Sequence, residues 1–185
     1  MLGEATRVLN ERETVERAQR GDVSAFEDIY REYQPRIIGY LRRLVGNPDL
    51  AADLAQDTFV NAYRAITRTQ SDLNLAPWLF TIASNVALSH HRRQRLVQWL
   101  PLGDPEGWTR EPDPQDRCVA REDLATAVAQ LPRDQAACLI LRVQYGFAYE
   151  EIGGILGISA GAARTRACRA RLALAKALQA SEEGK

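Results

Sequence analysis

Residues 149–171 of this 185-residue chain read YEEIGGILGISAGAARTRACRAR. The letters predict a short apolar helix, a turn centred on Gly157 and a second helix that begins near Ser159. Glycine fits this turn because it adopts a positive φ without steric cost. At about 100° per residue, one stripe of the second helix consists of small or apolar residues, Ala163, Ala167, Ala170 and Leu174. The stretch therefore predicts a helix-turn-helix.

The flanks of that second helix carry positive charge. Residues 162–176 contain five cations and no acidic residue, and the cations lie on both sides of the apolar stripe: Arg164, Arg166, Arg169, Arg171 and Lys176. Arginine binds phosphates, and in the major groove it can bind the edge of guanine with two hydrogen bonds. The pattern favours a helix that contacts duplex DNA. The alternative is a basic helix that is simply solvated.

The composition of the whole chain favours helices over strands. Apolar residues make up 45% of the sequence, charged residues 26% and aromatic residues only 7%. Long stretches of Ala, Leu and Arg are typical of helices, whereas strands are enriched in aromatic and β-branched residues. We therefore expect an all-α fold.

Residues 101–116, PLGDPEGWTREPDPQD, interrupt the helical pattern. They hold four of the eight prolines, two glycines and five acidic residues. Such a segment cannot continue a helix and has little apolar surface to bury. We expect two small helical domains, 1–97 and 120–185, joined by a flexible acidic linker at 98–119.

Local signals divide the first domain into helices. Asp22 predicts an N-cap for a helix over SAFEDIYREY, and Pro35 sits where a fresh helix over IIGYLRRLV could begin. Asn47-Pro48-Asp49 predicts the start of a helix that reaches about Ile66. We expect the buried stripe of that helix to contain Leu50, Leu54, Ala55, Phe59, Ala62, Tyr63 and Ile66. Residues 67–77 then predict a loop, followed by a long helix in PWLFTIASNVALSHHRRQR.

An acidic row lies on the helix that begins near Asn47. Asp49, Asp53 and Asp57 are spaced i, i+4, i+8, and like charges at that spacing weaken an isolated helix by about 0.2–0.5 kcal/mol per pair. The row, with Gln56, Asn61 and Arg64 nearby, suits a basic partner surface. The alternative is a solvated face whose first acid favours the helix N-terminus.

A basic cluster ends the last helix of the first domain. Residues 89–95 read SHHRRQR and follow Ser84 and Asn85, whose side chains can hydrogen-bond to bases or phosphates. The combination favours a nucleic-acid surface. The alternative is that Arg and His compensate the dipole at the helix C-terminus. Adjacent histidines cannot share one helix face, so a metal site there would need ligands from elsewhere.

No catalytic set of residues emerges, and we expect neither an enzyme nor a cofactor. The sequence contains no phosphate-binding loop, no GxSxG and no HExxH motif. Cys118, Cys138 and Cys168 lie far apart without metal-ligand spacing, which predicts reduced thiols and no metal site. No apolar run approaches the roughly 20 residues of a membrane span, so we expect a cytoplasmic protein without direct membrane insertion.

In this order, these pieces resemble the bacterial sigma factors of the extracytoplasmic-function group. DLAQDTF at 53–59 and PWLFTIASN at 77–85 look like the N-terminal sigma domain of that family, and EEIGGILGIS at 150–159 looks like the C-terminal one. The resemblance covers nearly the whole chain. It implies a sigma-2-like helical bundle, a sigma-4-like helix-turn-helix, and a promoter-specificity subunit of RNA polymerase that performs no chemistry.

The resemblance also implies partners and contacts. Core RNA polymerase would bind Asp53, Gln56, Asp57, Asn61 and Arg64. The minus-10 promoter element would bind a loop and a helix that contain Ser71, Asp72, Asn74, Trp78, Ser84, Asn85, His91, Arg92 and Arg93. The minus-35 element would bind Ser159, Ala160, Arg164, Arg166, Arg169 and Arg171. An anti-sigma factor is implied only because members of this family are normally held inactive by one.

Some positions depart from the family's usual pattern. Residues 161–166 read GAARTR where Gly-Thr-Val-Lys-Ser-Arg is common, and Gly153 stands where a small alanine is usual. Glycine in a helix interior costs about 1 kcal/mol relative to alanine, and alanine in place of valine removes methyl packing. We therefore expect a less stable C-terminal domain and altered specificity for the upstream element.

Two alternatives from other classes remain open on the sequence. One is a helix-turn-helix regulator that binds duplex DNA as a dimer without polymerase. The other is a helical adaptor that binds only protein. A dimeric regulator needs an apolar, self-complementary helix, whereas residues 172–180 offer only a short alanine-rich end.

Overall fold

The computed structural model describes residues 11–70, 72–99, 127–128 and 130–183, and every regular element in those ranges is a helix. The helices are α1 (Glu11–Gln19), α2 (Val23–Val45), α3 (Pro48–Ile66), α4 (Leu75–Trp99), α6 (Arg133–Gln144), α7 (Tyr149–Leu156) and α8 (Ala160–Glu183). The expectation of an all-α fold is confirmed for the described residues. The expected linker at 98–119 lies outside them except for its first two residues, which end α4.

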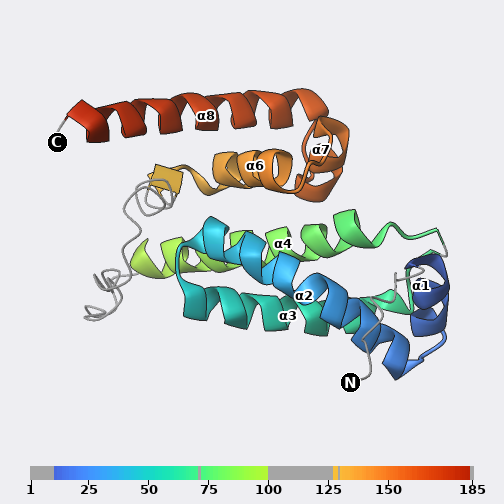
Figure 1. Ribbon diagram of the computed structural model, residues 1–185. Helices are drawn as coiled ribbons and strands as arrows, with labels where there is room; N and C mark the ends of the chain where they lie inside the picture. Colours follow the sequence, from blue (N-terminus) through green and yellow to red (C-terminus); the bar gives the residue numbers. More distant parts are fainter. Residues whose placement is uncertain (1–10, 71, 100–126, 129, 184–185) are drawn as a thin grey trace, which may run out of the picture.

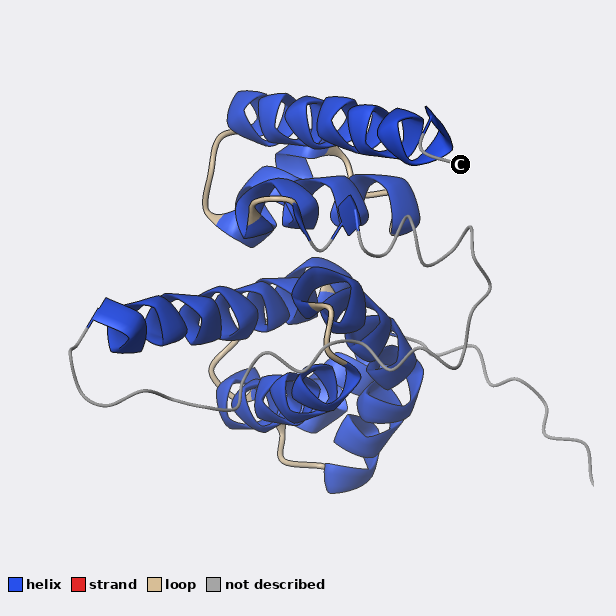
Figure 2. Cartoon of the chain, turned by 90° about the vertical axis from the view of Figure 1, so that its left-hand side faces the viewer, coloured by secondary structure: helices blue, strands red, loops and turns tan. Residues whose placement is uncertain are grey.

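The helices form two units, which Figure 1 shows one above the other. We call α1–α4 the N-terminal unit and α6–α8 the C-terminal unit. The core of the N-terminal unit is built from large side chains, and Ile29, Tyr33, Tyr40 and Phe80 are each at most 1% exposed. In Figure 2 the two units are again separate layers.

Local caps begin the helices of the N-terminal unit where the sequence predicts them. The Asp22 carboxylate accepts hydrogen bonds from the backbone N–H groups of Ser24 and Ala25, at 3.0 and 3.3 Å. The Asn47 side chain accepts one from Leu50 N–H at 2.9 Å. Both oxygens satisfy donors that a first helical turn leaves unpaired. The predictions for both helix starts are confirmed.

The prediction of a fresh helix at Pro35 is wrong, because α2 runs without a break from Val23 to Val45 with Pro35 inside it. Proline removes one hydrogen bond from the helix interior. The helix continues because its buried face does so on both sides of the proline, with Ile29 and Tyr33 before it and Ile37 and Leu41 after it. The Pro35 ring itself is exposed.

The C-terminal unit uses small residues where its helices meet. α8 buries Ala163, Ala167 and Ala170, each at most 1% exposed, as the predicted alanine stripe requires. The turn before α8 also follows the prediction, since Gly157 has a φ of +66° and its N–H donates to Gly153 O. Ser159 then caps α8 by accepting a hydrogen bond from Ala162 N–H at 3.1 Å.

Gly153 has a packing role that the sequence analysis missed. A Cβ at this position would lie 2.7 Å from Ile158 O and 3.2 Å from Ala160 N, both backbone atoms. Real Cβ atoms do not approach a backbone oxygen so closely, so α7 and the start of α8 fit together only if residue 153 has no side chain. The inference that this glycine simply weakens the domain overlooked that close approach.

Candidate DNA and protein interfaces

The acidic row predicted on α3 lies on the exposed face of that helix. Asp53, Gln56, Asp57, Asn61 and Arg64 are all exposed, while the opposite face buries Ala51, Leu54, Ala55, Thr58, Phe59 and Ala62. No ion pair among the described side chains involves Asp53 or Asp57. The row therefore presents two carboxylates that are available to a basic partner.

An exposed apolar patch lies beside this row and was missed by the sequence analysis. Val60 is 40% exposed and Tyr63 is 50% exposed, although the helical pattern placed Tyr63 in the buried stripe. Tyr63 packs edge-on against Phe26 of α2, with ring centroids 5.1 Å apart, and Tyr30 packs on Phe59 at 4.8 Å. α2 therefore covers only part of these rings, and the remainder adds apolar area next to the carboxylates.

The loop before α4 is tied to the rest of the N-terminal unit at its start. The Gln19 side-chain amide donates to Thr69 O at 3.2 Å and to Gln70 O at 2.9 Å. Asp72 and Asn74 follow and are exposed, and Asn74 O accepts a hydrogen bond from Trp78 N–H at 3.3 Å. Ser71 lies outside the described residues. The two described polar side chains of the predicted loop are therefore accessible and sit on an anchored segment.

The predicted contact residues of α4 separate into accessible and buried ones. Asn85, Arg92 and Arg93 are exposed, and Trp78 is half-buried. Ser84 differs, because it is 1% exposed and its hydroxyl shares a 2.8 Å hydrogen bond with the Tyr40 hydroxyl. Ser84 is therefore a core residue that satisfies a buried tyrosine, and its assignment to the DNA-binding surface is a misreading of a helical position as an exposed one.

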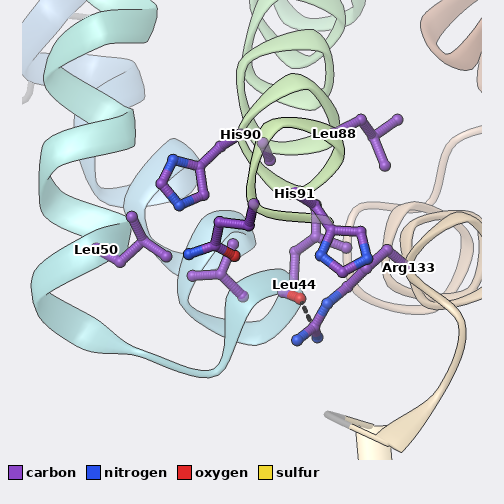
Figure 3. Close-up of a pocket in the computed structure, with 9 residues that line it drawn as sticks. Leu44, Leu50, Leu88, His90, His91 and Arg133 are labelled. Atoms are coloured by element: carbon purple, nitrogen blue, oxygen red, sulfur yellow. Dashed lines mark hydrogen bonds between the residues drawn. The ribbon is translucent and has the colours of Figure 1, made fainter. Parts of the chain in front are cut away.

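His91 lies at the edge of a small hollow between the units. Figure 3 shows His90, His91 and Arg133 around this hollow, together with Leu44 and Leu50. The described residues contain no group of three or more metal-ligating side chains.

The N-terminal half of α8 presents most of the cations predicted to bind the minus-35 element. Arg164, Arg169 and Arg171 are exposed, and Ser159 and Ala160 lie at the first turn. The Arg164 guanidinium lies over the Tyr149 ring, 5.2 Å from its centroid. Arg166 is different, because it forms an ion pair with Asp134 at 3.2 Å. Only part of the cationic set is therefore free to bind a phosphate.

The described cysteines differ in their surroundings. Cys138 is fully buried in α6, and burial raises the pKa of its thiol to about 11. A thiol with that pKa stays protonated at neutral pH, so it is a poor nucleophile. Cys168 is exposed on α8, and Cys118 lies outside the described residues.

Among the described helices, none combines the length and the apolar character that a membrane-spanning segment requires.

Comparison with known proteins identifies both units. A family model for sigma-70 region 2 matches residues 29–97, and a model for sigma-70 region 4 matches residues 121–174. The chain is also 38% identical to the RNA polymerase sigma factor CarQ of Myxococcus xanthus over 156 residues, which are 84% of this chain and 90% of CarQ. This chain belongs to the sigma-70 family of RNA polymerase sigma factors.

Further similarities place the sigma factor in the extracytoplasmic-function group. It is 33% identical to the extracytoplasmic-function (ECF) sigma factor EcfG of Rhodopseudomonas palustris over 144 residues, 78% of this chain and 80% of EcfG. Its fold is similar to that of RpoE from Bartonella quintana in a co-crystal structure with the anti-sigma factor NepR. The TM-score is 0.70 at 30% identity, and the match covers 85% of this chain and 98% of RpoE. Like other sigma factors, it directs transcription initiation and is not an enzyme.

Proposed function

We propose that the individual surfaces of this sigma factor divide the work as follows: α3 binds core RNA polymerase, α4 with its preceding loop binds the minus-10 element, and α8 binds the minus-35 element. The observation that carries the proposal is the separate exposure of a carboxylate row on α3 and of arginines on α8. The domain limits that go with it are 1–97 and 120–185, with 98–119 between them.

Core polymerase binding rests on charge and apolar area that lie side by side. Asp53 and Asp57 are unpaired within the described residues and exposed, and Val60 and Tyr63 supply apolar surface next to them. A protein interface commonly combines a desolvated aromatic anchor with charged groups that steer association. A basic helical surface on the polymerase is the partner that fits this combination.

Minus-10 recognition uses the accessible residues near α4. Asp72, Asn74 and Asn85 offer hydrogen-bonding groups, and Trp78 offers an aromatic ring on which an unstacked base can stack. Arg92 and Arg93 supply positive charge for the phosphates. Ser84 is left out of this set because its hydroxyl is committed to Tyr40.

Minus-35 recognition uses the N-terminal half of α8. Residues with small side chains at the helix start, Ser159 and Ala160, allow close approach to the groove, and Arg164, Arg169 and Arg171 reach outward. The first turn of α8 contains no acidic residue, so it does not repel the phosphates. Arg166 contributes less than the other arginines because Asp134 holds it.

A similar structure supports a regulatory partner in the proposal. RpoE of Bartonella quintana forms a complex with an anti-sigma factor, and we include such a partner, which would hold this chain inactive, in the proposal. The chain would act in the cytoplasm, where core polymerase and the chromosome are.

The decisive experiment is transcription in vitro with purified core polymerase on genomic fragments, with and without the chain. Start sites that require the chain are expected. Tight duplex binding by the chain alone, together with no chain-dependent start site, would favour the polymerase-independent regulator instead.

Substitution on α3 tests the docking surface separately. Asp57→Arg places a cation against a basic partner, so we expect co-purification with core polymerase to fall at least tenfold while the circular dichroism spectrum is unchanged. Glu32→Arg, an equal charge change at an exposed site of α2, is the control. Wild-type co-purification by Asp57→Arg would remove α3 from the interface.

A further inference from the structure

A single side chain of α1 holds the connection between α3 and α4. The Gln19 side-chain amide donates to Gln70 O at 2.9 Å and to Thr69 O at 3.2 Å. It also donates to the Thr69 hydroxyl oxygen at 2.8 Å. These acceptors lie 50 and 51 residues further along the chain. We call this set of hydrogen bonds the Gln19 anchor.

The chemistry of the partners fixes which end of the amide faces the connection. Carbonyl oxygens only accept hydrogen bonds, so the NH2 group and not Oε1 must point toward Thr69 and Gln70. The Thr69 hydroxyl accepts from Gln19 and in turn donates to Ile66 O at 2.6 Å. Ile66 is the last residue of α3, where carbonyl groups have no partner further along the helix. The Gln19 anchor therefore joins α1, the end of α3 and the start of the connection.

α1 is a fixed base for the Gln19 anchor. Val15 and Ala18 are buried, at 0% and 3% exposure. The first residue of the helix is bound as well, because the Tyr33 hydroxyl donates to the Glu11 carboxylate at 2.6 Å. Gln19 therefore extends from a helix that is packed against the core of the N-terminal unit.

The far end of the connection is fixed by apolar packing. Leu75 is fully buried, and Leu73 packs against the same core. Asp72 and Asn74 alternate with these leucines and are exposed. The two polar side chains therefore lie between the Gln19 anchor on one side and Leu75 on the other. Without the anchor, the segment that carries them would no longer be held at its start.

The placement of these polar side chains matters because the edge of a base is read by hydrogen bonds. Such bonds weaken steeply when their geometry departs from the optimum. A loop that is already ordered also loses less binding free energy on ordering than a loose loop does. A loose loop accepts different bases in different poses, so discrimination between them falls. Precise recognition therefore needs support from residues that do not contact the DNA.

We propose that Gln19 is a positioning residue for minus-10 recognition, which acts through Thr69 and Gln70 and does not contact DNA itself. The inference rests on the proposed function, in which Asp72 and Asn74 contact the minus-10 element. Removal of the Gln19 anchor should reduce discrimination between bases of that element. A role in stability alone would instead lower activity on every promoter by the same factor.

Three variants of the full chain test this role. Gln19→Met removes the hydrogen-bond donor and keeps the length and the helix propensity of the side chain. Gln19→Lys is the rescue variant, because an ammonium group donates to carbonyl oxygens and a cation is favoured near a helix C-terminus. Gln70→Met makes the same exchange in the connection and is the matched control, since Gln70 contributes its backbone oxygen to the anchor.

Holoenzyme assembled from core polymerase and each full-length variant provides the readout. A chain-dependent promoter is altered one base at a time in its minus-10 and minus-35 elements, and initial transcription rates are measured. The discrimination ratio is the rate on the original promoter divided by the rate on each altered promoter. Because each ratio compares promoters for one variant, a smaller folded fraction cancels.

Gln19→Met should lower the discrimination ratio at one or more minus-10 positions by about threefold or more, the equivalent of one neutral hydrogen bond. Its ratios at minus-35 positions should match those of wild type. Gln19→Lys and Gln70→Met should keep the wild-type ratios at both elements. Unchanged minus-10 ratios for Gln19→Met, an equal fall at both elements, or a fall that Gln19→Lys does not reverse would overturn the positioning role. An equal fall for Gln70→Met would overturn it too.

A variant that combines Asp72→Ala with Asn74→Ala separates this failure from a failure of the proposed function. If the double variant keeps every wild-type minus-10 ratio, the loop does not read the element and the proposed function fails with the inference. If the double variant lowers the ratios and Gln19→Met does not, the proposed function stands and only the role of Gln19 is wrong.

Discussion

The buried face of α8 differs in side-chain size from the largest buried side chains of the N-terminal unit. The N-terminal unit buries large residues such as Ile29, Tyr33 and Phe80, whereas the buried positions described on α8 are all alanine. Large side chains leave a cavity when they are truncated, and small ones leave no room when atoms are added. The comparison teaches that the core of the N-terminal unit is vulnerable to the loss of side-chain atoms, whereas the contact between α7 and α8 is vulnerable to added atoms.

The largest expected effect comes from truncating a buried side chain in the N-terminal unit. Ile29→Ala should lower the free energy of unfolding by about 2–5 kcal/mol, because a fully buried side chain is replaced by a cavity. Val23→Ala, at a position that is 56% exposed, is the control and should change little. Urea denaturation followed by circular dichroism measures both, and equal effects would contradict the comparison.

Adding a methyl group at the contact between α7 and α8 should have the next largest effect. Gly153→Ala adds one methyl group 2.7 Å from Ile158 O, so it should destabilise the unit by about 1–3 kcal/mol despite the better helix propensity of alanine. Gly154→Ala is the matched control, because nothing lies within 4 Å of its added Cβ. That variant should gain up to about 1 kcal/mol. Stabilisation by both substitutions, measured by thermal denaturation, would remove the packing argument.

The arginines of α8 allow DNA binding by this helix to be tested separately from its packing. Arg164→Ala and Arg171→Ala should each lower the slope of log K against log salt by about 0.9 for duplex containing the minus-35 element, since each removes one phosphate contact. Arg166→Ala should lower the slope less, because Arg166 is paired with Asp134 in the structure. Filter binding at several salt concentrations measures the slopes. Three equal reductions would show that the ion pair does not matter.

The smallest effect concerns the cap of α2. Hydrogen bonds from Ser24 and Arg17 lower the pKa of Asp22 from 3.8 to about 2. A carboxyl with a depressed folded pKa contributes stability above its unfolded pKa and loses it as the pH falls through the folded one. Asp22→Asn keeps a capping oxygen but cannot titrate. The stability difference between wild type and this variant should shrink between pH 3.8 and about 2, and a constant difference would contradict the assignment.

Elements with local causes were predictable from the sequence. The caps at Asp22 and Asn47 and the turn at Gly157 depend on groups only a few residues away. The local sequence was therefore sufficient to predict them. The alanine stripe and the exposed row on α3 follow from helical periodicity. Tyr63 and Ser84 were misplaced because periodicity gives a direction around a helix but not which neighbouring helix covers that direction.

The sequence by itself determined that this protein is helical, where several of its helices begin and end, and which charges face outward. Tertiary structure alone decided that α2 passes through Pro35, that Gly153 must lack a side chain, that Asp134 holds Arg166, and that Gln19 holds Thr69. The physical reason is the separation along the chain between the residues that interact. Caps and turns act within a few residues along the chain, whereas these contacts connect atoms that only the packing of separate helices brings together.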